Sequence, residues 1–191
     1  MDIEPADAFP GDPDGLERLW TPHRMAYLGG QDKPSEPGGQ ACPFCRAAAS
    51  DDDAASLVVA RGVNAFVVLN LYPYNSGHLM VLPYRHVGDL TELDEAESTE
   101  VMALTRNAIR ALRAVYAPHG FNLGVNQGSA AGAGIAAHLH QHVVPRWDGD
   151  SNFMPIVARA KTLPEVLAVT RERLAAAWPE SQEPQPQEEP C

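Results

Sequence analysis

Long apolar stretches are missing from this 191-residue sequence, since no run approaches the roughly 18 residues that a membrane-spanning helix needs. The first residues also lack a basic start followed by an apolar segment, so no secretory signal is indicated. Cysteine is scarce, and the three that occur, Cys42, Cys45 and Cys191, are an odd number that argues against a disulfide framework. We therefore expect a cytoplasmic protein with no membrane partner.

Basic residues are absent from both ends of the chain. Residues 1–15 contain five acids and residues 179–191 contain four, without a lysine or arginine in either segment. The remainder holds 16 acids against 14 bases, so the net charge of -11 belongs mostly to the ends. This distribution allows an anionic ligand in the core, but it offers no basic stripe for nucleic acid, and we expect no nucleic-acid partner.

The length and composition indicate one domain with tails. The chain is 45% hydrophobic and 20% charged, as is usual for a globular protein, and it is too short for two substantial domains. Residues 1–15 and 179–191 are rich in Pro, Asp, Glu and Gln, which predicts flexible acidic tails. We expect a single domain over residues 16–178 whose first part, residues 16–28, forms an arm.

The middle of the chain alternates between two periodicities. Apolar runs at residues 57–60, 65–69 and 79–82 are separated by turn residues and predict three meandering strands. From Leu90 the spacing changes to three and four residues, which predicts a helix with one apolar face (Val101, Leu104, Ala108, Leu112 and Val115) and a Thr91–Asp94 capping box. Its three arginines, Arg106, Arg110 and Arg113, are expected on the solvated side.

Two more strands and a helix complete the expected domain. The strands are predicted at residues 121–126 and 138–144, with a Gly/Ala/Ser-rich loop at residues 128–134 between them. A final helix is predicted over residues 162–178, with Pro164 in its first turn. The order of elements predicts an α+β fold with a mainly antiparallel sheet, one long helix and a C-terminal helix.

Three histidines alternate with other residues at His138, His140 and His142. On a strand they would project from one face at about 7 Å intervals, a register that is seldom purely structural. Imidazole is a common zinc ligand, but side chains in a straight row converge poorly on one ion. We therefore favour a nucleophilic imidazole assisted by a neighbouring histidine that donates to phosphate oxygens.

The stretch from His138 to Val144 resembles the signature of the histidine triad (HIT) family. The similarity extends upstream to Asn70, to Gly77-His78 and Pro83-x-x-His86, and to Asn126-Gln127-Gly128, so that it covers about residues 42–148. It implies a HIT-like fold. The motifs at residues 71–75 and 138–150 look most like the bacterial diadenosine tetraphosphate phosphorylase branch, which implies nucleotidyl transfer from a dinucleoside polyphosphate to inorganic phosphate.

The resemblance also implies roles for individual residues. His140 would be the nucleophile, His142 would bind the α-phosphate, and His138 would orient the site. The implied substrate-binding residues are Asn70 at the ribose, His78 near the site, and Asn126, Gly128, Ser129 and Gly134 around the phosphates. Gly134 stands where relatives often carry a Ser or Gln that bonds phosphate. Ser129 could replace that side chain, but the sequence leaves both phosphate and water open as the acceptor of the nucleotidyl group. Gln141 replaces an apolar residue but should face away from the chemistry.

Cys42-Pro43-Phe44-Cys45 has several interpretations. The pair could be an inert turn, a redox pair or a metal site, and the βαβ context of a redox pair is not indicated here. The HIT resemblance implies a structural zinc held by Cys42, Cys45, His86 and His138, and no organic cofactor. It also implies a homodimer or homotetramer.

Three other functions remain open from the sequence. The protein could hydrolyse dinucleoside polyphosphates or nucleoside phosphoramidates instead of phosphorolysing them. It could bind nucleotides without catalysis, as a sensor or scaffold. It could also be a zinc-dependent hydrolase that uses the same residues as metal ligands.

Overall fold

The computed structural model describes residues 42–150 and 163–179. The expected arm and both expected tails, apart from Pro179, lie outside these ranges. The described helices and strands follow one another as α2 (Pro43–Ala49), β1 (Val58–Arg61), β2 (Ala65–Leu69), β3 (Leu79–Pro83), the 3-10 helix η2 (Leu90–Glu92), α3 (Glu95–Tyr116), β4 (Gly120–Val125), the 3-10 helix η3 (Ser129–Ala131), β5 (Gln141–Arg146) and α5 (Leu167–Ala176).

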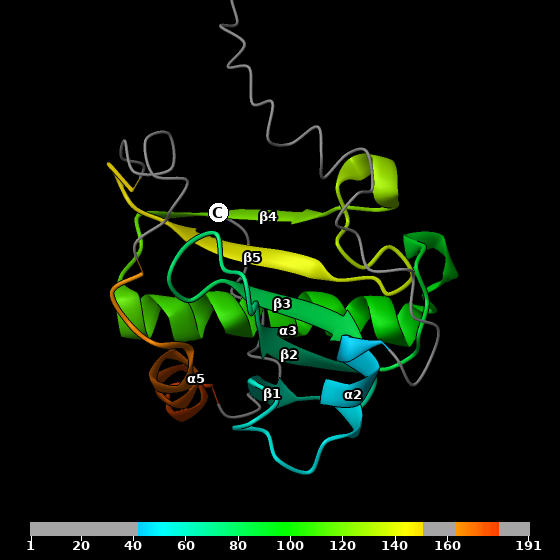
Figure 1. Ribbon diagram of the computed structural model, residues 1–191, viewed down its shortest axis with the longest axis horizontal. Coiled ribbons are helices and arrows are strands. Elements are labelled where there is room, and N and C mark those ends of the chain that lie inside the picture. The colour runs from blue at the N-terminus through cyan, green and yellow to red at the C-terminus, as the bar shows by residue number, and fades with distance from the viewer. Residues whose placement is uncertain (1–41, 151–162, 180–191) are drawn as a thin grey trace, which may run out of the picture. The chain divides into compact units, whose positions relative to one another are not determined.

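The strands form one sheet in the order β1-β2-β3-β5-β4, and every neighbouring pair is antiparallel (Figure 1). The predicted α+β class with a mainly antiparallel sheet is therefore confirmed. β1 and β2 form a hairpin, and residues 62–64 connect the two strands. Of the described helices, none combines the length and the apolar character that crossing a bilayer requires.

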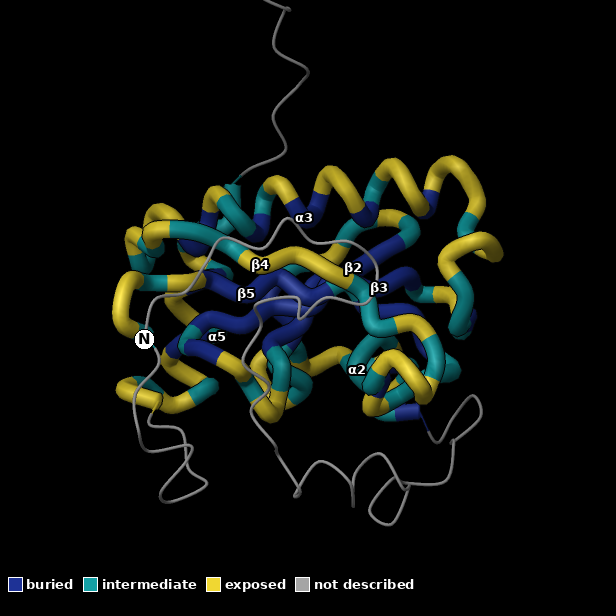
Figure 2. The backbone as a smooth tube through the Cα atoms, turned by 90° about the horizontal axis from the view of Figure 1, so that it is seen from above, coloured by how far each residue is buried: buried dark blue, intermediate teal, exposed yellow. Residues whose placement is uncertain are grey.

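Helices cover the two faces of this sheet (Figure 2). All residues of β2 and β3 are buried, and successive side chains point to opposite faces. On one face Val67, Leu69 and Val81 pack against α3 and α5. On the other, Phe66, Val68 and Leu82 pack with residues of α2. Because α2 is short, it covers only part of this second face of the sheet. No described helix covers the part of this face that β4 and β5 form.

The long helix begins later than the sequence predicted. Asp94 is its N-cap and forms a capping box with Glu97, so the expected Thr91–Asp94 box is wrong. Thr91 belongs instead to η2, where its N–H and hydroxyl donate to Asp89. The expected apolar face is confirmed, because Val101, Leu104, Ala108 and Leu112 are buried and Val115 is half-buried, and the three arginines are exposed.

Two predicted boundaries also differ from the structure. The last strand begins at Gln141 and not at His138. Pro83 has no N–H and ends β3; its carbonyl oxygen accepts a bond from the His138 ring, while the N–H of Leu139 donates to Val87, so this segment leaves the sheet. The last helix begins at Leu167; Thr162 lies outside the described residues, and Val166 is extended.

Candidate active site

The face of the sheet opposite α3 presents side chains at every second position of β5. His142, Val144 and Arg146 lie on this face, where α2 does not reach. Gln141 points to the other face, and its amide donates to the Thr105 hydroxyl of α3 at 2.9 Å. This orientation confirms that Gln141 faces away from the histidine side chains.

His140 immediately precedes β5 and is 5% exposed. Its Nδ1 lies 2.8 Å from the backbone oxygen of His138. Because a carbonyl oxygen can only accept, Nδ1 carries the proton and donates. Burial lowers the pKa of His140, which favours the neutral ring, so Nε2 keeps a lone pair. The ring is held from one side by Phe44, with centroids 5.2 Å apart.

The tautomer of His142 follows from a chain of hydrogen bonds. The backbone N–H of Tyr74 donates to Nδ1 of His78 at 3.1 Å, so the proton of a neutral His78 ring is on Nε2. That Nε2 lies 2.9 Å from Nδ1 of His142 and donates to it. The proton of a neutral His142 is therefore on Nε2, which has no hydrogen-bond partner among the described residues although it is buried.

The environment keeps both of these histidines neutral. Burial, followed by the neighbouring His142 and His140, lowers the pKa of His78 to about 3. Burial, followed by His140, lowers the pKa of His142 to about 4. The site thus holds a neutral ring with a lone pair, His140, beside a neutral ring with an N–H donor, His142, and the two ring centroids are 5.0 Å apart. Such a pair can attack phosphorus with one ring and stabilise a phosphate oxygen with the other.

A second cluster includes His138, whose carbonyl oxygen accepts the hydrogen bond from His140. The ligand atoms of Cys42, Cys45, His86 and His138 all lie within 4.8 Å of one another. Both cysteine sulfurs lie 3.5 Å from Nδ1 of His138, and Cys45 Sγ lies 3.2 Å from Nδ1 of His86. These separations suit a tetrahedral ion with bonds of about 2.0–2.3 Å. His138 donates through Nε2 to Pro83 at 3.0 Å, which leaves Nδ1 free to coordinate.

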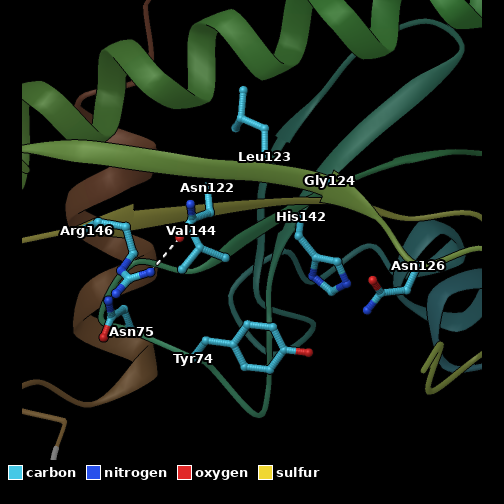
Figure 3. A pocket seen from close by; sticks show the side chains of 9 residues that line it. All are labelled: Tyr74, Asn75, Asn122, Leu123, Gly124, Asn126, His142, Val144 and Arg146. Atoms are coloured by element: carbon cyan, nitrogen blue, oxygen red, sulfur yellow. Dashed lines mark hydrogen bonds between the residues drawn. The ribbon is translucent and has the colours of Figure 1, made fainter. Parts of the chain in front are cut away.

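A pocket of about 320 Å³ opens beside His142. Figure 3 shows Asn126 and His142 at one end, Arg146 with Asn75 and Asn122 at the other, and the ring of Tyr74 across from the strands. Leu123, Gly124 and Val144 complete the lining. The pocket therefore joins His142 to a polar network further along β5.

Residues 52–149 match the HIT domain family model. The chain belongs to the HIT family. It is 50% identical over 171 residues to an AP-4-A phosphorylase of Mycobacterium tuberculosis. The aligned residues make up 88% of this chain and 87% of that protein. It is 34% identical over 86 residues, 45% of this chain and 46% of the relative, to an asymmetrical bis(5'-nucleosyl)-tetraphosphatase of Schizosaccharomyces pombe.

A solved HIT structure supports the fold. A Zn-bound histidine triad family protein from Mycobacterium smegmatis aligns with a TM-score of 0.59 and 28% sequence identity. The alignment covers 73% of this chain and 94% of that one. The first histidine of the triad, His138, contributes its side chain to a cluster that could hold a metal ion, and its backbone carbonyl oxygen accepts a hydrogen bond from His140.

The remaining expected substrate-binding residues occupy different places. Asn126 lines the pocket with His142. Asn70 is not among the residues that line the pocket; its amide nitrogen lies 3.3 Å from Nδ1 of His78, and His78 itself is fully buried. Gly128, Ser129 and Gly134 lie in the connection between β4 and His138, which includes η3, and they are not part of the pocket lining.

Three residues at the site were not predicted from the sequence. Phe44 lies between the two cysteines in the sequence and packs on His140, but nothing in its local sequence distinguishes it from a core phenylalanine. Tyr74 lies inside a motif that the family resemblance did mark. Arg146 could have been found, because strand alternation continues from His142 through Val144 to Arg146 on one face.

Proposed function

We propose that this HIT protein transfers a nucleotidyl group from a dinucleoside polyphosphate to inorganic phosphate through a covalent intermediate on His140. The observation that carries the proposal is the fixed orientation of two neutral imidazoles, a lone pair on His140 beside an N–H on His142. The substrate class and the acceptor follow from the 50% identity to an AP-4-A phosphorylase over most of the chain.

The first chemical step makes one bond and breaks one. Nε2 of His140 attacks the α-phosphorus, an N–P bond forms, and the bridging P–O bond breaks, so a nucleoside triphosphate leaves as an anion when the substrate is diadenosine tetraphosphate. Nε2–H of His142 donates to an oxygen of the phosphate group during this step. Because phosphoryl transfer states spread charge over oxygens, positioning and charge stabilisation are what the site has to provide.

The second step restores the enzyme. An oxygen of inorganic phosphate attacks the same phosphorus, the N–P bond breaks, and ADP leaves while His140 regains its lone pair. Water in the same position would give AMP instead. Asn126, beside His142 in the pocket, supports the acceptor with its amide group.

The cluster behind the nucleophile is proposed to hold one structural zinc ion through Cys42, Cys45, His86 and His138. Its donor set and compactness support this assignment, as does the Zn-bound relative. Four protein ligands leave no open position, so the ion supplies rigidity instead of activating water. The residues of the chain then fix the backbone of His138, whose carbonyl oxygen orients His140.

A homodimer joined through the sheet is also proposed. Among the described strands β4 lies at one edge of the sheet, and its Leu123 is 50% exposed. An unpaired edge with an exposed apolar side chain favours pairing with a second copy. Light scattering that finds a monomer at micromolar concentration would contradict this assembly.

The nucleophile is tested with His140→Ala and, as a matched control, His119→Ala, because His119 is exposed and pairs only with Asp148 among the described residues. We expect the first variant to lose turnover and the acid-labile adduct formed from labelled diadenosine tetraphosphate, and the second to keep both. Labelled phosphate should appear in ADP. Near-normal turnover in His140→Ala would refute the nucleophile, and AMP as the main product at millimolar phosphate would make the protein a hydrolase.

A further inference from the structure

The residues of β5 that line the pocket begin at His142 and continue only toward the C-terminal end of the strand, although Asn126 also lies at the His142 end of the pocket. Its lining runs from His142 through Val144 to Arg146, whereas His140 lies before His142 and contacts Phe44 of α2. Four residues of strand span about 13 Å. The pocket therefore leads away from the nucleophile for a distance that a nucleoside polyphosphate fills and a small amine does not.

The direction of the pocket has a consequence for the proposed reaction. In an in-line displacement the leaving oxygen departs on the side of phosphorus opposite to the attacking atom. The attacking atom belongs to His140, so the leaving group emerges toward the end of β5. The pocket lies where that group has to be accommodated.

The far end of the pocket carries a positive charge held in a fixed position. Asp150 accepts from Nε of Arg146 at 2.6 Å and from Nη2 at 2.8 Å, and Asn122 accepts from Nη1 at 2.6 Å. Asn75 also donates to Asp150, at 2.8 Å. These contacts hold the guanidinium in one orientation and use three of its five N–H groups.

The arrangement of this ion pair makes the guanidinium the part that a ligand meets. The side chain of Arg146 is 44% exposed, whereas that of Asp150 is 9% exposed. Among the described residues that line the pocket, Arg146 carries the only formal charge, because His142 is neutral. An anionic ligand thus finds a preorganised cation with two remaining N–H donors at this end.

We propose that this pocket is the binding site for the leaving nucleotide and that Arg146, positioned by Asn122 and Asp150, binds its distal phosphates. The inference rests on the proposed nucleotidyl transfer by His140. It makes Arg146 a residue that selects long polyphosphate substrates over substrates with small leaving groups.

The test compares two substrates that share the adenylyl group and differ in what leaves. Values of kcat/KM are measured for diadenosine tetraphosphate, which loses ATP, and for adenosine 5'-phosphoramidate, which loses ammonia, at one saturating phosphate concentration. The variants are Arg146→Met and Asn122→Asp. The second replaces an exposed side chain by one of equal size, so it tests the pocket even if Arg146→Met fails to fold.

We expect the ratio of the two values, tetraphosphate over phosphoramidate, to fall about ten-fold in both variants, because a charge-assisted contact is lost or opposed by a new carboxylate. Arg110→Met, which removes an exposed arginine on the outer side of α3, should leave the ratio unchanged. Equal loss of both activities, or an unchanged ratio in Asn122→Asp, would overturn the inference. A wild-type protein that cleaves neither substrate would instead overturn the proposed function, and the inference with it.

Discussion

Replacing His78 by leucine is predicted to slow nucleotidyl transfer, although His78 is fully buried behind His142 and outside the pocket lining. Its Nε2–H is the donor that holds the proton of His142 on Nε2, at 2.9 Å from Nδ1. Leucine supplies no donor, so His142 can exchange tautomers, and the form with a bare Nε2 repels the phosphate oxygen that it should stabilise.

The size of the effect can be bounded from the contacts. Complete loss of a proton-donating catalytic group costs about 10²- to 10⁴-fold. His78→Leu leaves His142 in place but unfixed, so we expect kcat to fall about 10- to 100-fold. The N–H of Tyr74 and Nδ1 of His142 also lose a partner, which should lower the free energy of unfolding by about 1–3 kcal/mol.

The assay combines kcat with a direct measurement of the tautomer. Nitrogen NMR of His142 should show a protonated Nε2 and a bare Nδ1 in the wild type and a mixture in His78→Leu. His78→Gln, whose amide can still donate, should recover most of the rate, and His119→Leu should leave it unchanged. A folded His78→Leu protein with wild-type kcat and an unaltered His142 spectrum would refute the reasoning.

Further predictions concern stability and the metal cluster. Burial lowers the pKa of His78 to about 3 and that of His142 to about 4, so between pH 6.5 and about 4 the unfolded chain binds more protons than the folded one. The free energy of unfolding should therefore decrease as the pH is lowered through this range, by up to about 1.4 kcal/mol per pH unit for each histidine. Urea unfolding should show a shallower dependence in His78→Gln, and identical slopes would contradict this. Gly62→Ala should cost about 2 kcal/mol by the same measurement, because the new Cβ would lie 2.3 Å from a Glu100 oxygen whose carboxylate accepts the N–H groups of residues 63–65; a loss below about 0.5 kcal/mol would count against it. Cys42→Ser should release zinc, detected by metal analysis, and lower Tm by about 5–10 °C, since a ligand at about 100 times its Kd contributes about 2.7 kcal/mol; an unchanged Tm with no zinc in the wild type would remove the metal.

Structural features that depend on the periodicity of a single segment could be predicted from the sequence. The apolar face of α3 and the opposite orientation of Gln141 both follow from local spacing, and the structure has them as expected. The antiparallel α+β fold was likewise predictable from the order of the elements. The boundaries of the elements were less predictable. The long helix was expected to start with a Thr91–Asp94 capping box, but Asp94 forms the box with Glu97, and the Glu97 side chain also accepts a hydrogen bond from Arg85, which lies before the helix.

The sequence by itself determined which residue types alternate at residues 138–142 and which apolar positions share a helix face, because these patterns follow from backbone geometry over a few residues. Only the tertiary structure decided that the three histidines do not form one row. His138 turns toward Cys42 and Cys45, more than 90 residues away, whereas His142 faces the pocket that leads to Arg146. Such convergence depends on how α2, β3 and β5 pack against one another, since burial and hydrogen bonding between distant segments set each ring's direction and its proton.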